Sequence, residues 1–210
     1  MHRSGKPARR RTPQQARSRE THDAIVEAAA RLFAEAGLRR TTTARVAKLA
    51  GVSPGSMYQY FPSKEALVTA IYEREADRQH AGLLALVAEL GTDDLPRLIR
   101  AFVSSTVETL ERNIELHRVL LEELPRVSGV AAMRRIDALA AKTVATLLAS
   151  ARARVQPRDL EMAALLLVRA SRYTTVALLD DAFEGVARRA FIDELSDMIA
   201  AYLLLPRTWS

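Results

Sequence analysis

The chain has 210 residues and no cysteine, which excludes disulfides and thiolate zinc sites and is compatible with a reducing cytoplasm. With 49% hydrophobic residues it can form one or two compact domains, but no apolar run approaches the roughly 18 residues of a membrane span, and the N-terminus lacks the apolar segment of a signal peptide. Residues 1–64 carry 13 Lys and Arg against 4 Asp and Glu, whereas the remainder carries 18 against 21. We therefore expect a cytoplasmic protein, without a membrane partner, whose basic N-terminal part binds nucleic acid.

The first segment is polar, rich in arginine and interrupted by proline, so it cannot bury a core. We predict that residues 1–16 form a disordered basic arm. Two interpretations stay open for it. Either Arg9, Arg10 and Arg11 reach phosphates or a neighbouring minor groove, or the arm is a solvated tail without ordered contacts.

A helix is predicted from Arg17 to Ala36 because apolar residues recur there at helical spacing, and Gly37 ends it. The stretch that follows, TTTARVAKLAGVSPGSMYQYFPSK at residues 41–64, indicates two short helices joined by a tight turn. Thr42 or Thr43 can cap the first of them, because a threonine hydroxyl accepts from the free backbone N–H groups of a helix start.

The second half of this stretch carries the signals of a turn and a new helix. Gly51 can take the left-handed conformation that a helix end usually requires, and Ser53-Pro54 provides a capping hydroxyl and a proline at the first helical position. Met57 and Phe61 share one face of the new helix. The other face is then free to enter a major groove, which is the logic of a helix-turn-helix.

These residues resemble the DNA-binding domain of the TetR family of bacterial transcriptional regulators. The resemblance covers residues 17–67, through the segments AIVEAAARLFAEAG, TTARVAKLAGVS, GSMYQYF and PSKEAL. It implies an all-α protein of about nine helices, with a helix-turn-helix DNA-binding domain at residues 17–64 and a helical effector-binding and dimerisation domain at residues 65–210. It also implies a homodimeric repressor that binds a palindromic double-stranded DNA operator and responds to a small-molecule effector of unknown identity.

The resemblance carries DNA contacts over to the matching positions of this chain, which are Thr42, Thr43, Arg45, Pro54, Gly55, Ser56, Tyr58, Gln59, Tyr60 and Lys64. Side chains that meet phosphates set the register, and side chains in the groove read the sequence. Pro54 stands where many relatives have lysine or glutamine, and Arg45 replaces a commonly acidic residue, so the operator sequence does not follow from the motif. For the two tyrosines, Tyr60 above all, the alternative is packing as core against the first helix.

The rest of the chain has a helical pattern, with no strand pattern and no internal repeat. Ser63 caps a long helix, Gly91 and Thr92 break it, and Pro125 and Gly129 mark a loop. The predicted helices span residues 63–90, 93–112, 114–124, 130–155, 157–181 and 183–205.

Two of these helices bear on assembly. The helix that contains residues 162–179 is apolar nearly all round, which is typical of a helix buried on more than one side. In the last helix, one apolar seam consists of Phe191, Leu195, Met198 and Tyr202. The resemblance implies that the last two helices of each subunit form a four-helix dimer interface, and the alternative is that both helices complete the core of a monomer.

A ligand cavity among the middle helices is also implied by the resemblance. The candidates for its lining are polar or aromatic residues on otherwise apolar helices, namely Phe102, Thr106, His117, Met133, Arg169 and Tyr173. Arg169 and Tyr173 lie four residues apart and share a helix face. An unpaired Arg169 would favour an anionic ligand, whereas pairing with Glu122 or Glu123 would permit a neutral one. The alternative for each candidate is an ordinary core or surface residue.

Other function classes find little support in these residues. There are four histidines and no metal-binding or nucleotide-binding motif, and Asp77 with His80 lacks a third metal ligand, so neither an enzyme nor a cofactor is predicted. An architectural DNA-binding protein without an effector is the second alternative. Such a protein would not need a large separate C-terminal body.

Overall fold

The computed structural model describes residues 13–127, 129–157, 159–178 and 188–206. These residues form nine α-helices and no strand, as predicted from the sequence. The helices are α1 (Pro13–Arg40), α2 (Thr43–Ala50), α3 (Pro54–Tyr60), α4 (Lys64–Leu90), α5 (Leu95–Arg112), α6 (Ile114–Val127), α7 (Gly129–Ser150), α8 (Leu160–Ala177) and α9 (Arg188–Leu204). In the part of the chain that is described, none of them is long and apolar enough to cross a bilayer.

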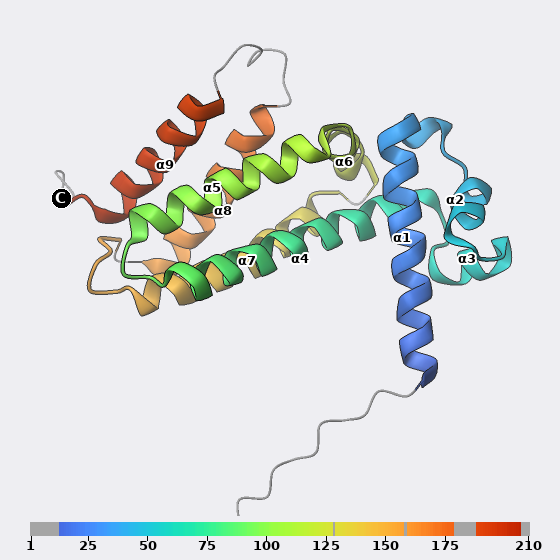
Figure 1. Cartoon of the computed structure of the whole chain (residues 1–210), viewed down its shortest axis with the longest axis horizontal. Helices are drawn as coiled ribbons and strands as arrows, with labels where there is room; N and C mark the ends of the chain where they lie inside the picture. The colour runs from blue at the N-terminus through green and yellow to red at the C-terminus, as the bar shows by residue number, and fades with distance from the viewer. Residues whose placement is uncertain (1–12, 128, 158, 179–187, 207–210) are drawn as a thin grey trace, which may run out of the picture.

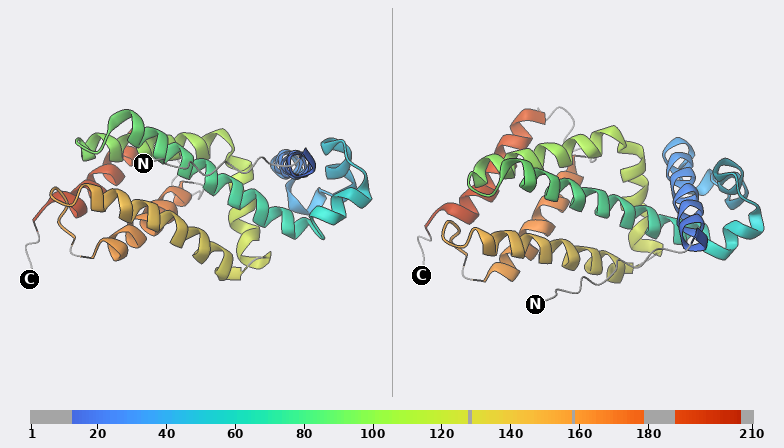
Figure 2. Two further views of the ribbon diagram at one scale, coloured as in Figure 1. Left: turned by 90° about the horizontal axis from the view of Figure 1, so that it is seen from below. Right: turned by 60° about the horizontal axis from the view of Figure 1, so that its bottom comes forward.

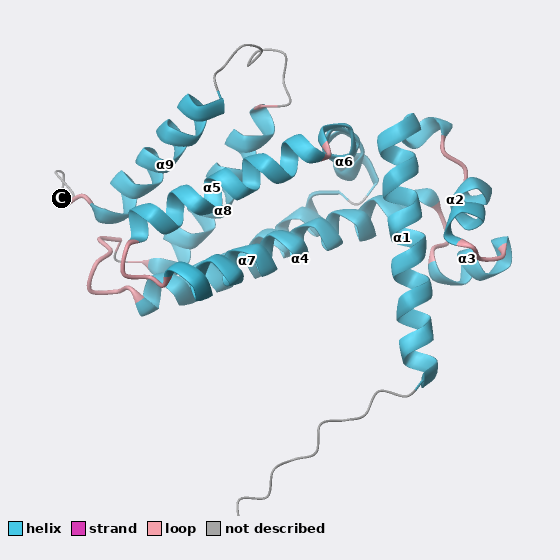
Figure 3. Ribbon diagram, viewed as in Figure 1, coloured by secondary structure: helices cyan, strands magenta, loops and turns pink. Residues whose placement is uncertain are grey.

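The molecule is elongated, with a small head at one end and a larger body at the other (Figure 1). Helices α1, α2 and α3 make the head, and α4 runs from the head along most of the body (Figure 2). The arrangement contains only helices and their connections (Figure 3) in the residues described. The helix α4 therefore joins the two parts covalently.

The start of each helix near the head has a local chemical cause. The hydroxyl of Thr42 accepts from the backbone N–H of Arg45 at the start of α2. Ser53 and Ser63 cap α3 and α4 in the same way. Gly51 ends α2 with φ at 69°, a left-handed conformation in which glycine has no Cβ to clash. The predicted caps at Ser53 and Ser63 are thus confirmed, and Thr42 rather than Thr43 caps α2.

Two separate hydrophobic cores hold the protein together. The first core combines the head with the beginning of α4 and one face of α6, and its most deeply buried large residues are Ile25, Phe33, Met57, Leu67, Ile71, Leu120 and Leu124. The second core fills the far end of the body from α5, α7, α8 and α9, and includes Leu98, Val107, Leu148, Leu195 and Ile199. Helix α6 packs on α1 and α4, so a helix of the body belongs to the core of the head.

Several boundaries differ from the prediction. Helix α1 begins at Pro13 because proline suits the first helical position, so residues 13–16 are helical and not part of an arm. Residues 1–12 of the predicted arm, with its three arginines, lie outside the described residues. Gly37 interrupts α1 with φ at 73°, although the helix resumes to Arg40.

The predicted loop at Pro125 and Gly129 is wrong. Helix α6 continues through Pro125 to Val127, and α7 already begins at Gly129. Pro125 forfeits its own backbone hydrogen bond to the preceding turn. The buried Leu116, Leu120 and Leu124 hold the helix in place.

The connection after α7 also differs from the prediction. Helix α7 ends at Ser150 rather than at residue 155. The guanidinium of Arg152 donates to the carbonyls of Val155 and Pro157, each at 3.0 Å, and so stabilises a connection there. The predicted end of the helix at residues 157–181 and the predicted start of the helix at residues 183–205 lie outside the described residues.

Candidate DNA-binding surface and ligand cavity

The helices α2 and α3 are joined by a hydrogen bond between side chains. Thr43 Oγ1 and the Tyr58 hydroxyl lie 2.9 Å apart, although the residues are separated by most of both helices. Met57 on the other face of α3 is fully buried in the head core. Its burial orients α3 so that Tyr58 and Gln59 face solvent. The remaining predicted contacts Thr42, Arg45, Pro54 and Gly55 are exposed as well, and Ser56 is half-buried.

Two predicted DNA contacts also have partners within the head. The Lys64 ammonium donates to the carbonyl of Leu38 at 3.0 Å, and so ties the start of α4 to the end of α1. The Tyr60 ring packs on the head core, and its hydroxyl donates to Ser18 Oγ at 3.3 Å. For Tyr60 the structure favours the alternative of packing against the first helix. Lys64 retains two further N–H donors, so a phosphate contact stays a prediction.

Two further predicted DNA contacts, Arg45 and Ser56, are held in place by hydrogen bonds within the head. The Arg45 guanidinium donates to the carbonyl of Arg40 at the end of α1, at 3.2 Å. Ser56 Oγ lies 2.9 Å from Ser53 Oγ, the hydroxyl that caps α3. These bonds restrict the rotamers of side chains on the exposed side of the motif, which lowers the entropy cost of binding a rigid partner such as a duplex.

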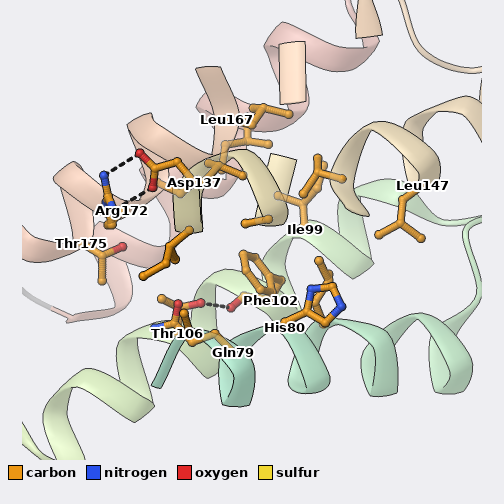
Figure 4. A pocket seen from close by; sticks show the side chains of 18 of the residues that line it. Gln79, His80, Ile99, Phe102, Thr106, Asp137, Leu147, Leu167, Arg172 and Thr175 are labelled. Carbon is orange, nitrogen blue, oxygen red and sulfur yellow. Dashed lines mark hydrogen bonds and ion pairs between the residues drawn. The ribbon is translucent and has the colours of Figure 1, made fainter. Parts of the chain in front are cut away.

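A cavity of about 250 Å³ lies in the body between the two cores. Its wall is mostly apolar and comes from every helix from α4 to α9. The polar side chains in the wall include Tyr72, Glu75, Gln79, His80, Thr106, His117, Asp137, Ser171, Arg172 and Thr175. Figure 4 shows Arg172, Asp137 and Thr175 on one side of the cavity and Ile99 and Leu147 toward the other.

The structure divides the predicted ligand residues into two groups. Phe102, Thr106 and His117 line the cavity, which keeps them candidates for ligand binding. Met133 does not line it and packs against the head core.

Arg169 and Tyr173 lie on the outer surface, where the Tyr173 side chain is 59% exposed, so their assignment to the cavity is wrong. The wall is formed instead by the neighbouring face of α8, with Val168, Arg172 and Thr175. Sequence alone does not set the rotation of a helix that is apolar nearly all round.

The polar side of the cavity centres on a buried carboxylate. Asp137 of α7 is only 4% exposed and accepts two bonds from Arg172, at 2.7 and 2.9 Å. Arg172 also donates to the Tyr72 hydroxyl at 2.7 Å, and Arg169 approaches Asp137 from outside at 3.4 Å. Burial raises the pKa of Tyr72, so its hydroxyl keeps its proton at neutral pH. Arg169 thus pairs with Asp137, and not with Glu122 or Glu123.

A second charged group connects the cavity to the head. Glu75 of α4 is 5% exposed, lines the cavity, and accepts from Arg78 at 2.9 Å and Arg74 at 3.5 Å. Arg74 in turn donates to Glu27 of α1 at 2.8 Å. Burial lowers the pKa of His117, and the nearby Glu75 charge opposes part of the shift.

A more polar hollow of about 370 Å³ opens beside the cavity between α4 and α5. It shares Glu75, Gln79, Leu83, Phe102 and Thr106 with the cavity wall.

The residues missed by sequence reasoning include Tyr72, Glu75 and Gln79 on α4, Asp137 on α7, and Arg172 and Thr175 on α8. The three α4 residues recur at a spacing of three and four, so their shared helix face could have been found. Asp137 and Arg172 could not, because nothing local indicates that they meet.

Comparisons with known proteins agree with this geometry. The family model described as "Bacterial regulatory proteins, tetR family" matches residues 25–71, which contain the helix-turn-helix. A second model, described as "Tetracyclin repressor-like, C-terminal domain", matches residues 94–203, more than half of the chain. The chain belongs to the TetR family. The prediction made from the N-terminal motifs is confirmed for the whole architecture.

Individual members of the TetR family are similar over part of the chain. The transcriptional regulator TtgR of Pseudomonas putida is 45% identical over 64 residues, which is 30% of each protein. The transcriptional repressor KstR2 of Mycolicibacterium smegmatis is 32% identical over 119 residues, or 57% of this chain and 56% of the repressor. The chain therefore matches about a third to a half of the length of these relatives. A TetR-family regulator of Pectobacterium atrosepticum has the same fold, with a TM-score of 0.71 and 20% identity over 94% of this chain and all of that one.

The predicted dimer seam of this TetR-family chain divides into two parts. Phe191 and Leu195 are buried in the second core of the protomer, so they have no surface to offer a partner and their assignment to the seam is wrong. Met198 and Tyr202 are 50% and 44% exposed. Because successive residues of a helix point in different directions, α9 packs one apolar face on α5 and exposes another.

The exposed large apolar residues of the last two helices are Met162, Leu166 and Tyr173 on α8 and Met198, Tyr202 and Leu205 at α9. On α8 their spacing is four and seven, which puts them on one stripe. Among the described residues no group of three metal-binding side chains occurs.

Proposed function

We propose that this TetR-family protein is a homodimeric transcriptional repressor in the cytoplasm that binds a palindromic operator and releases it when a small molecule fills the cavity. The exposed helix-turn-helix supplies the groove-reading surface, and the basic N-terminal part supplies attraction to phosphates. The names of TtgR as a transcriptional regulator and KstR2 as a transcriptional repressor support this function.

The observation that carries the proposal is the shared use of α4 and α6. The first two turns of α4 lie in the head core through Leu67 and Ile71, and the next turns line the cavity. Helix α6 contributes Leu120 to both. A ligand that prefers a different spacing of these helices would also prefer a different position of the head.

Dimerisation is supported by the exposed apolar stripe on α8 and α9. An exposed apolar surface on a soluble protein commonly marks a site of association. Two copies that bury Met162, Leu166, Tyr173, Met198 and Tyr202 against each other would form a two-fold symmetric bundle of four helices. The two heads of such a dimer can meet successive major grooves on one side of the duplex.

An architectural DNA-binding protein is the alternative. The cavity argues for an effector-binding protein instead, because a protein that only coats or bends DNA does not need a mostly apolar cavity whose wall contains buried polar groups.

Selection of bound DNA from a random pool with the full-length protein tests the proposal. We expect enrichment of one site with two-fold symmetry, and a stoichiometry of at least two chains per duplex in sedimentation. Recovery of sequences without a common or symmetric motif would contradict it and would favour the architectural alternative.

A further inference from the structure

The cavity has two chemically different ends. The end away from the head is apolar, because Leu95, Leu98, Leu148, Ile199 and Leu203 of the second core form it. A bound molecule gains transfer free energy there in proportion to the apolar surface that it buries. The polar side chains nearest to this end are Thr92 and His80, and the His80 ring is paired with the Thr143 hydroxyl at 3.3 Å.

The end next to the head is polar. Tyr72 packs on the head core, and His117 lies on α6 between the core residues Leu116 and Leu120. Arg172 with Asp137 completes this end, and the view of Figure 4 places them apart from Leu147. A molecule that fills the whole cavity must therefore be polar toward the head and apolar away from it.

Two nitrogen atoms at the polar end are buried and, within the described residues, have no hydrogen-bond partner. They are Arg172 Nε and His117 Nε2. Buried polar atoms of native proteins are almost always bonded, so each such atom calls for an explanation. Arg172 Nε carries a hydrogen and can only donate. The Tyr72 hydroxyl oxygen already accepts from Arg172, so its own hydrogen can be donated too.

The charges at this end decide between an anionic and a neutral ligand. The positive charge of Arg172 is already paired with Asp137 through two short bonds. Arg169 adds a second positive charge beside Asp137, but it lies outside the cavity, where its side chain is 44% exposed and solvated. Arg74 and Arg78 are likewise already paired with Glu75. A ligand carboxylate would have to compete with Asp137 and Glu75 for these cations in a poorly solvated space, which is costly.

We infer that the ligand of this cavity is a compact, neutral, amphipathic molecule whose carbonyl or ester oxygen accepts hydrogen bonds from Arg172 Nε and the Tyr72 hydroxyl, with its apolar part in the end lined by Leu98 and Leu148. The inference rests on the proposed function only where it calls this molecule an effector. Binding itself does not depend on DNA.

The test uses the full-length protein and two probes with nine carbons, 2-nonanone and nonanoate, in isothermal titration calorimetry at neutral pH. We expect saturable binding of 2-nonanone and much weaker binding of nonanoate. Nonanoate binding as tight as, or tighter than, that of the ketone would overturn the neutral class. Failure of both probes to bind would overturn it as well.

Matched variants test the orientation of the probe. Tyr72→Phe removes one donor and Arg172→Lys removes the Nε–H while it keeps the charge, and each should weaken 2-nonanone binding by roughly fivefold to tenfold. The controls are Tyr173→Phe on α8 and Arg135→Lys on α7, which change the same residue types at exposed positions and should bind as the wild type does. Equal binding by all four variants would overturn the orientation.

Operator binding separates this inference from the proposed function. If 2-nonanone binds but leaves the affinity for the selected operator unchanged, the ligand class stands and the ligand-responsive repressor fails. If operator binding responds to some other molecule while 2-nonanone does not bind, the repressor stands and the ligand class fails.

Discussion

At the scale of single residues, Lys64 combines two tasks. Its ammonium group donates to the carbonyl of Leu38 at the end of α1, which also accepts from the backbone N–H of Thr41 at 3.3 Å, and its position at the start of α4 suits a phosphate contact. The sequence motif predicted only the second task. A hydrogen bond across 26 positions has no local signal in the sequence.

Lys64→Ala should therefore affect both stability and DNA binding. We expect the free energy of unfolding to fall by about 1–2 kcal/mol, because a half-buried carbonyl loses a charged donor, and the dependence of operator affinity on salt to lose about one charge. Urea unfolding and binding titrations at several salt concentrations measure the two effects. Lys48→Ala, an exposed lysine on α2, is the control for stability. An unchanged unfolding midpoint would contradict the role of the bond to Leu38.

His117 gives the protein a dependence on pH. Because burial lowers its pKa in the folded state, the unfolded state binds more protons once the pH falls below the usual value near 6.5. The free energy of unfolding should then fall with the pH below that value. In His117→Asn this part of the decrease should disappear, whereas His22→Asn on the exposed side of α1 should keep it. Urea unfolding at pH 7.5 and 5.5 tests this, and equal slopes for both variants would contradict it.

At the scale of elements, helix α9 separates stability from assembly. Leu195 is 4% exposed in the second core, and Met198 less than one turn away is 50% exposed. Leu195→Glu should lower the stability of the protomer by several kcal/mol, because it buries a charge without a partner. Met198→Glu should leave the protomer folded and dissociate the dimer. Circular dichroism and sedimentation measure the two outcomes, and a folded dimer of Met198→Glu would place the interface elsewhere.

The same helix shows what a sequence can and cannot predict. The existence of the nine helices and the caps at Ser53 and Ser63 follow from local chemistry, so the sequence predicts them correctly, and it narrows the cap of α2 to Thr42 or Thr43. The face that a helix buries can be predicted from its own sequence only when one side of the helix is polar. On α8 apolar residues surround the helix nearly completely, and on α9 they cover more than one face, so the rotation of both helices depends on neighbours far along the chain. For this reason Tyr173 was assigned to the cavity and Leu195 to the dimer seam, both wrongly.

At the scale of the whole molecule, the head core and the cavity wall share side chains, and the most deeply buried of them is Leu120. Leu120 of α6 is 1% exposed, belongs to the head core and also lines the cavity. Interior packing leaves little room for a side chain to move independently of its neighbours. A ligand that displaces Leu120 must therefore also displace residues of α1 and α4, and energetic coupling between the two sites is expected to pass through this contact.

Truncation of Leu120 should weaken this coupling. Leu120→Ala and Leu98→Ala both remove a buried leucine from the cavity wall, and each should lower stability by about 2–5 kcal/mol. Of these two leucines, only Leu120 also belongs to the head core. We therefore compare the dissociation constant of the operator with saturating ligand to that without ligand, and expect Leu120→Ala alone to bring their ratio closer to one. Because coupling is reciprocal, the same variant should lose the effect of operator DNA on ligand affinity. If Leu98→Ala reduced the ratio equally, the signal would reach the head through the body as a whole and not through α6.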